Sequence, residues 1–237
     1  MKHLHFETLS STNTYLKTHY QTLDHLTWVK TDFQTKGRGR SHRMWYGSLD
    51  GLMCSVLIKS ELPIDLISRL PLLAATSLHK VLYNYTPELM IKWPNDLLIK
   101  GKKLSGILTE SQISKNEVHA IIIGFGININ QATFDPSISD IATSLHLETK
   151  LTYDLMQIYQ KLVHQFEQDL ELFHKDPQFV IDYCNQHLAL KDQMITYVKA
   201  TGTYQGTVLS IDRQGHLVVQ ANNDIDTLSS GEVTLKK

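Results

Sequence analysis

Hydrophobic positions recur with two different periods along this chain, and these periods predict both strands and helices. Strict alternation over residues 3–9 predicts a strand, because successive side chains of a strand point to opposite faces. Helical spacing of apolar residues predicts one helix over 66–84 and a long amphipathic helix from Leu155 to Phe173. Shorter helices are expected after the capping residues 10–13 and over 178–187. Further strands are expected at 26–33, 52–58, 89–93, 96–99, 104–109 and 118–129.

The pattern changes after residue 190, where short alternating segments replace the helices. Strands are expected there at 204–211, 216–220 and 226–235. Fewer than fifty residues of short strands are typical of a small barrel. We therefore predict two domains, an α+β domain over residues 1–187 and an all-β domain over residues 188–237.

Composition narrows the class of protein. The chain has 237 residues, 42% of them hydrophobic and 20% charged, which excludes a disordered or low-complexity protein. The longest apolar runs reach about ten residues, well short of the ~20 that a membrane-spanning helix needs. The N-terminal residues show no apolar signal-peptide segment, and Cys54 and Cys184 form no CxxC motif. We expect a cytoplasmic protein with no membrane partner.

One segment carries much of the positive charge of a chain whose net charge is only −1. Residues 34–45 read QTKGRGRSHRMW. The glycines allow the backbone to approach a ligand, the arginines can surround phosphate oxygens, and Trp45 offers a face on which a base can stack. This composition favours a small anionic ligand over a long nucleic acid. Taken alone, however, GRGR is more often a solvated loop or an RNA-contacting arm.

Three further segments carry polar residues at predicted strand ends. KWPND (92–96) forms a corner at Pro94, KLSGIL (103–108) begins a strand with a lysine, and GFGININ (124–130) ends the apolar strand. Each has a simpler explanation by itself, namely a hairpin turn, a surface lysine beside a bulge glycine, or a strand end. GFGININ lacks the third glycine of a dinucleotide-binding fingerprint, so we reject that fold.

Taken together and in this order, these segments resemble the biotin–protein ligases. That family carries STN near its first helix, then Q-x-x-GRGR-x-G-R-x-W, KWPN-D, K-x-x-GIL and G-x-G-x-N, and all five patterns occur here within residues 8–130. GEV (231–233) is similar to the family's small SH3-like domain. The resemblance is to the short form, biotin–[acetyl-CoA-carboxylase] ligase without an N-terminal DNA-binding domain, because STN begins at residue 11. It implies a class II synthetase-like α+β fold, with a mixed, mostly antiparallel sheet flanked by helices, followed by an SH3-like barrel.

Two positions depart from the family pattern. His42 stands where the family has the loop's third glycine, and the Ser-Pro pair that usually follows the tryptophan is absent. Neither departure removes an arginine or a lysine that the family's chemistry needs.

The resemblance implies a reaction in two steps. Biotin and ATP form biotinyl-5′-AMP with Mg²⁺ on the phosphates, and a lysine of a biotin carboxyl carrier domain then displaces AMP. By position in the pattern, Lys103 and Arg40 lie at the carboxylate and α-phosphate, and Asp96 lies near the reacting centre, as a metal ligand or to orient the incoming lysine. The expected partner is the carrier protein of a biotin-dependent carboxylase, a homodimer is allowed, and DNA is not a partner.

The same resemblance assigns binding roles to the remaining candidates. Arg38 closes the loop that contains Gly37 and Gly39, and Arg43 contacts the β- and γ-phosphates. The biotin ureido group is held by Ser11, Thr12 and Gln34, the turn by Asn13, the biotin tail by Gly106, Ile107 and Leu108, and adenine by Trp45 and Asn128.

Other functions receive less support from the residues. A lipoate or octanoate ligase of the same superfamily lacks the GRGR–Trp loop, and an RNA-binding module is disfavoured by the flat net charge. His3 and His5 share one strand face without a third ligand, so we expect no metal site in the protein itself. Cys54 lies mid-strand, where a buried, inert thiol is the default.

Overall fold

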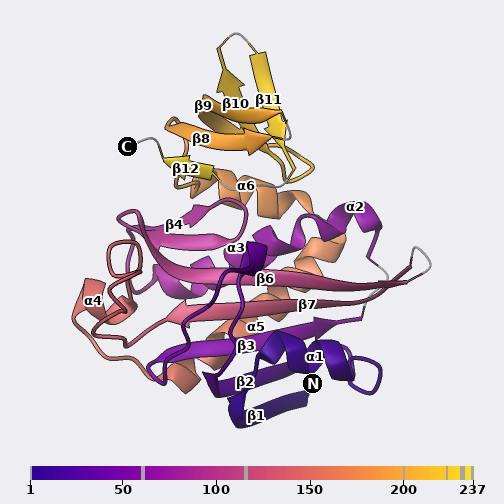
Figure 1. The fold of residues 1–237 in the computed structure, drawn as a ribbon. Coiled ribbons are helices and arrows are strands. Elements are labelled where there is room, and N and C mark those ends of the chain that lie inside the picture. The colour runs from indigo at the N-terminus through magenta and orange to yellow at the C-terminus, as the bar shows by residue number, and fades with distance from the viewer. Residues whose placement is uncertain are drawn as a thin grey trace.

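Seven strands form one large sheet in the computed structural model of the chain, which describes residues 2–59, 62–114, 117–199, 201–222, 224–229 and 233–235 (Figure 1). In spatial order the strands are β1 (Lys2–Leu9), β2 (Thr27–Gln34), β3 (Gly51–Ile58), β7 (Glu117–Asn128), β6 (Lys102–Ser114), β5 (Asp96–Ile99) and β4 (Leu89–Lys92). Only β1 and β2 pair in parallel. The predicted mixed, mostly antiparallel sheet is confirmed.

Helices cover both faces of this sheet. One face packs against α1 (Thr12–His19), and Leu16 of that helix meets Val29, Leu57 and Ile122. The opposite face packs against α3 (Leu70–Tyr83) and α5 (Leu155–Lys175), where Phe166 lies edge-on to Trp28 with ring centroids 5.6 Å apart. Since both faces are covered, β3 is buried at every position.

The remaining helices are short. They are η1 (Arg40–His42), α2 (Ile64–Ile67), α4 (Leu145–Thr149) and α6 (Gln178–Gln186). The helix predicted over 66–84 is confirmed over the range of α3, but its expected start is wrong, because the chain breaks between α2 and α3. Pro71 explains the break, since proline lacks an amide hydrogen and is tolerated only in the first turn of a helix.

A second, five-stranded sheet follows α6, and every strand pair in it is antiparallel. Its strands are β11 (Asp224–Leu228), β10 (Leu217–Ala221), β9 (Gly202–Ile211), β8 (Met194–Lys199) and β12 (Val233–Leu235). The one strand predicted over 226–235 is wrong, because β11 and β12 lie at opposite edges of the sheet. Gly231 and Glu232 of the GEV motif lie outside the described residues.

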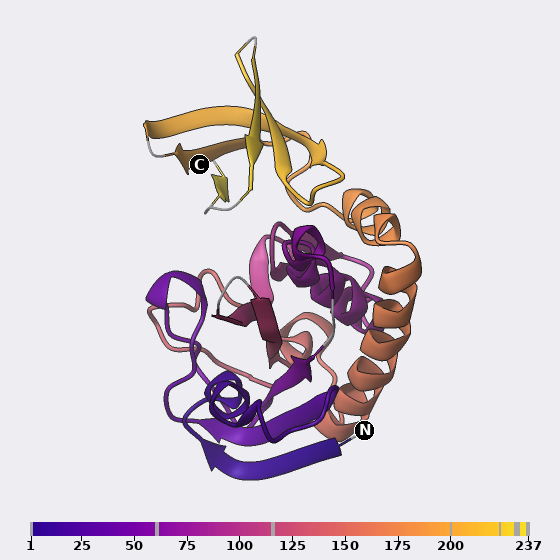
Figure 2. The same cartoon turned by 90° about the vertical axis from the view of Figure 1, so that its right-hand side faces the viewer.

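The small sheet follows α6 and lies beyond α3 from the large sheet (Figure 2). Backbone and side-chain hydrogen bonds join the C-terminal region to the large sheet. The β4 residue Ile91 donates its amide to the His187 carbonyl and accepts from the Ala189 amide, both at 2.8 Å. Trp93 donates its indole hydrogen to the Gly215 carbonyl at 2.9 Å. β4 and the residue after it are thereby bonded to the segment that follows α6 and to the turn between β9 and β10. Within the part of the chain that the structure describes, no helix is long and apolar enough to cross a membrane.

Candidate active site

A cavity of about 550 Å³ opens where the loop after β2, the N-terminus of α1 and the turn before β5 meet over β6 and β7. It gathers residues from sequence segments far apart in the chain. Every residue proposed for the site from sequence lines it except Gly37, namely Ser11, Thr12, Asn13, Gln34, Arg38, Gly39, Arg40, Arg43, Trp45, Asp96, Lys103, Gly106, Ile107, Leu108 and Asn128.

One end of the cavity is a polar grip formed by Ser11, Thr12 and Gln34. Ser11 is the N-cap of α1 and its side chain accepts from the Thr14 amide. The Gln34 side-chain carbonyl accepts from the Thr12 amide at 2.8 Å and from the Thr12 hydroxyl at 3.2 Å. These groups are uncharged, so this end can hold a neutral polar ligand group.

The cationic loop, residues 36–45, is a small hairpin. The Trp45 amide donates to the Gly37 carbonyl at 3.0 Å, and the Gly39 amide donates to the Arg43 carbonyl at 2.8 Å. A Cβ on residue 37 would lie 2.5 Å from the Trp45 carbonyl oxygen, so glycine is required for the two limbs to approach. Gly37 therefore lies at the base of the hairpin, outside the cavity lining.

His42, which stands where the family has the loop's third glycine, lies in the turn of this hairpin. Ser41 has left-handed backbone torsions, φ 52° and ψ 40°, inside the turn that ends at His42. A side chain at positive φ is uncommon outside asparagine and glycine. The turn thus places its strained residue one position before the site where the family carries glycine.

Trp45 lies over the middle of the cavity floor. Gly106 of β6 and Gly126 of β7 are register partners. A Cβ on Gly126 would lie 2.3 Å from the indole Cε2, and one on Gly106 would lie 3.2 Å from the indole ring. The two glycines leave the flat space that the indole occupies. Lys103 Nζ lies 5.9 Å from the centroid of the same ring.

The other end of the cavity is charged. Lys103 Nζ forms an ion pair with the buried Asp96 Oδ1 at 2.8 Å. Arg40 donates to the Asn95 side-chain carbonyl at 3.1 Å. Among the described lining residues, one carboxylate, Asp96, faces five basic side chains, those of Arg38, Arg40, Arg43, Lys92 and Lys103. Such a surplus of positive charge in a concave site attracts anions.

Several lining or supporting residues escaped the sequence analysis. Asn95 accepts from Arg40 and donates to the Ile107 carbonyl, and Ser55 lies buried beneath the grip. The far wall comes from the segment after β7, with Phe134, Ile138, Ile141 and Ala142. Lys103 fixes that wall, because its amide donates to the Ile141 carbonyl and its carbonyl accepts from the Thr143 amide.

Glu110 also escaped the sequence analysis. It lies four residues past Gly106 on the same side of β6, and its alternation with Gly106 and Leu108 was the signal available in the sequence.

The cysteines and N-terminal histidines lie apart from the cavity lining. Burial raises the pKa of Cys54 and raises that of Cys184 to about 12, which keeps both thiols protonated and inert. The prediction for Cys54 is confirmed. His3 contacts the Tyr159 hydroxyl and His5 contacts Asp32, each at 2.9 Å. No cluster of three metal-ligating side chains occurs among the described residues.

Comparison with known proteins identifies the family. The model described as the biotin/lipoate A/B protein ligase family matches residues 5–128, more than half of the chain. The chain belongs to this ligase family. The match includes α1, the cationic loop and the KWPND and KLSGIL segments, so the family region and the cavity largely coincide.

Relatives within the ligase family extend the likeness over most of the chain. The bifunctional ligase/repressor BirA of Bacillus subtilis is 33% identical over 215 residues, covering 88% of this chain and 66% of its own length. The biotin–[acetyl-CoA-carboxylase] ligase of Mycobacterium tuberculosis is 28% identical, covering 85% of this chain and 76% of its own length. This chain therefore spans slightly under two thirds of the bifunctional relative.

A solved member of the family shares the architecture. The biotin protein ligase of Aquifex aeolicus, in complex with biotin and ATP, superposes with a TM-score of 0.86 at 26% identity, covering 100% of this chain and 99% of that one. A helix-flanked sheet followed by a small second sheet is thus a shared fold of these proteins.

Proposed function

We propose that the protein ligates biotin to a lysine of a biotin carboxyl carrier domain, using ATP and forming biotinyl-5′-AMP. The observation that carries this proposal is one cavity whose lining combines the uncharged polar grip of Ser11, Thr12 and Gln34 with five basic side chains. The names of the relatives, biotin–[acetyl-CoA-carboxylase] ligase among them, and the biotin and ATP bound to the Aquifex protein support it.

The first step joins two anions. A carboxylate oxygen of biotin attacks the α-phosphorus of ATP, the bond from that phosphorus to the bridging oxygen breaks, and pyrophosphate leaves. Two unit charges 4 Å apart repel by about 4 kcal/mol at an effective dielectric of 20. Lys103 and Arg40, at the charged end of the cavity, offset this repulsion. Arg38 and Arg43 hold the remaining phosphate oxygens.

The second step transfers the acyl group. The uncharged amine of a carrier lysine attacks the carbonyl carbon of the mixed anhydride, the bond from that carbon to the AMP oxygen breaks, and the amine loses a proton. The Asp96 carboxylate can hold the incoming amine, because it is the one carboxylate among the described lining residues and can only accept hydrogen bonds.

Mg²⁺ fits the cavity as an ion that accompanies the ATP phosphates. Magnesium is commonly bound by one or two carboxylates together with substrate phosphates. Asp96 is the one lining carboxylate among the described residues, and it lies among the basic side chains that would hold the phosphates. Bound there, the ion would neutralise charge on the phosphates.

Biotin and adenine are assigned to different lining residues of the cavity. Ser11, Thr12 and Gln34 hold the ureido group, Asn13 fixes the turn beneath them, and Gly106, Ile107 and Leu108 line the tail. Trp45 stacks on adenine. Asn128, whose amide donates to the Thr143 carbonyl at 3.0 Å, keeps a second amide hydrogen for the base.

The domain plan follows the two sheets. We propose a class II synthetase-like catalytic domain over residues 1–187 and an SH3-like barrel over 188–237, supported by the start of the all-antiparallel second sheet at Met194. The carboxylase carrier domain is the proposed protein partner, in the cytoplasm, and a homodimer is compatible with this plan.

The test is direct transfer. The protein is incubated with biotin, ATP, Mg²⁺ and a carrier domain, and the carrier is probed with streptavidin. Label that requires ATP supports the proposal. Absence of label under all conditions, or transfer of lipoate in place of biotin, would contradict it.

A further inference from the structure

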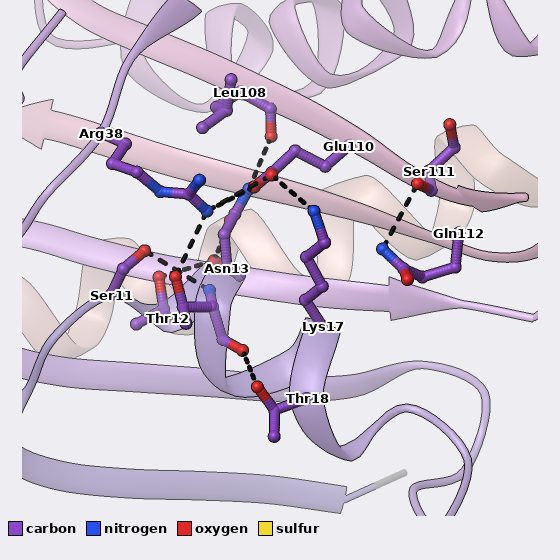
Figure 3. Close-up of polar contacts among 12 residues, drawn as sticks. Ser11, Thr12, Asn13, Lys17, Thr18, Arg38, Leu108, Glu110, Ser111 and Gln112 are labelled. Atoms are coloured by element: carbon purple, nitrogen blue, oxygen red, sulfur yellow. Dashed lines mark hydrogen bonds and ion pairs between the residues drawn. The ribbon is translucent and has the colours of Figure 1, made fainter. Parts of the chain in front are cut away.

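Glu110 of β6 lies between the grip and the cationic loop, outside the cavity lining (Figure 3). Its carboxylate accepts from the Asn13 amide at 3.0 Å and from Arg38 Nη2 at 3.1 Å. Lys17 of α1 adds a third, longer contact at 3.6 Å. The Glu110 side chain is only 18% exposed, so this is a partly buried junction of three elements and not a surface ion pair.

Asn13 connects Glu110 to the grip. The Asn13 side-chain carbonyl can only accept, so the Ser55 hydroxyl, 2.6 Å away, must donate to it. The Ser55 hydroxyl oxygen also lies 2.6 Å from the Thr12 hydroxyl oxygen, and Thr12 bonds Gln34 through its amide. Glycine at 124 allows this arrangement, since a Cβ there would lie 2.1 Å from the Asn13 carbonyl oxygen.

Arg38 connects Glu110 to the loop. Its Nη2 also donates to the Thr14 hydroxyl at 3.2 Å, while the side chain as a whole stays 44% exposed. Hydrogen bonds to a charged partner are roughly twice as strong as neutral ones. The Glu110 carboxylate is therefore the group that holds this arginine, and with it the start of the loop, against α1 and β6.

We propose that Glu110 is a positioning residue that couples occupation of the biotin grip to closure of the cationic loop. A ligand that fixes Thr12 and Gln34 fixes Asn13, which aligns the Glu110 carboxylate to hold Arg38. ATP then meets a loop already in place. This role rests on the proposed function, because it names what biotin and ATP do at the same cavity.

The test uses Glu110→Gln, which keeps an acceptor for Asn13 and removes the charge that holds Arg38. Glu88→Gln is the matched control. Glu88 forms an ion pair with Lys100 at 2.9 Å, and neither residue lines the cavity. Three quantities are measured for each full-length protein: biotin affinity, the ATP dependence of biotin-stimulated pyrophosphate release, and trypsin cleavage within residues 36–43 with and without biotin.

The expected result is a split between the ligands. Glu110→Gln should bind biotin with an affinity within about threefold of wild type and lose the protection of the loop by biotin. It should need roughly tenfold more ATP for half-maximal rate, a factor typical of coupling between two sites. Glu88→Gln should match wild type. Arg38→Gln combined with Glu110→Gln should be no worse than Arg38→Gln alone, since Glu110 acts through its contact with Arg38.

Other outcomes would overturn the assignment. One such outcome is an ATP dependence and a loop protection in Glu110→Gln that both match wild type. Another is an equal loss of affinity for biotin and for ATP, and a third is an additive loss of activity in the double variant. If Glu110→Gln fails to fold, Arg38→Gln tests the same contact, and retained protection of the loop by biotin in that variant would refute the coupling. A wild-type protein that releases no pyrophosphate with biotin would instead contradict the proposed function.

Discussion

Removal of the charge of Lys103 is the sharpest perturbation of the proposed chemistry. Lys103→Met keeps most of the apolar stem and deletes the ammonium group that lies 2.8 Å from Asp96. A unit charge about 4 Å from the developing charge contributes about 4 kcal/mol at an effective dielectric of 20, which is about 10³ in rate. The side chain is 38% exposed, so solvent screening reduces the expected loss to about 10².

The assay is pyrophosphate release on mixing biotin and ATP, followed at saturating concentrations of both. Lys102→Met is the matched control, since Lys102 is the neighbouring lysine on β6 and contacts the exposed Ser139 carbonyl instead of the cavity. Stability should change by no more than about 1 kcal/mol in Lys103→Met, because the Lys103 side chain is 38% exposed and solvent screens the ion pair. A near-normal rate in Lys103→Met, or an equal loss in Lys102→Met, would refute the role of Lys103.

Three further predictions concern binding, packing and pH. Trp45→Ala should weaken ATP binding by about 1–3 kcal/mol and biotin binding much less, as measured by calorimetry. Equal losses for both ligands would mean that Trp45 supports the loop's fold without stacking on adenine. Gly124→Ala should weaken biotin at least tenfold in the same measurement, because its Cβ would lie 2.1 Å from the Asn13 carbonyl oxygen, and unchanged affinity would contradict this packing. Stability should fall by about 3 kcal/mol between pH 6.5 and 4 through His79, measured by urea unfolding, and Val or Gln at this position should flatten the profile.

The direction of the pH effect follows from the surroundings of His79. Burial lowers the pKa of His79 to about 4 in the folded protein, against about 6.5 in the unfolded chain. Its Nε2 hydrogen is donated to the Leu89 carbonyl and its Nδ1 accepts from the Tyr183 hydroxyl, so the neutral ring is satisfied. As the pH falls below 6.5 the unfolded chain takes up the proton first, and stability is lost. A flat profile in the wild-type protein would contradict this.

Local pattern was enough to predict most of the large sheet. The unbroken apolar run of β7 and the helical spacing of α5 depend only on neighbouring residues, and both elements lie within a few residues of the expected ranges. The strand β8 was missed, and β11 and β12 were merged. Which strand pairs with which depends on distant contacts, since β12 pairs with β8 and β11 pairs with β10.

The same distinction applies to the cavity. Residues in short motifs, such as Lys103 and Trp45, could be proposed from sequence because the motif itself carried the signal. The wall around Ile141 has no such signal, and backbone bonds to Lys103 bring it to the cavity. Glu110 and Ser55 act beneath the lining, through Asn13, and a role of that kind becomes visible only when side-chain contacts are known.

Transfer of biotin to a carrier lysine tests the account most directly. Intact-mass spectrometry of a carrier domain, after incubation with the protein, biotin, ATP and Mg²⁺, measures the transfer without a label. The account predicts a mass increase of one biotinyl group on one lysine, dependent on ATP and slowed about a hundredfold by Lys103→Met. An unmodified carrier, or modification that proceeds without ATP, would contradict it.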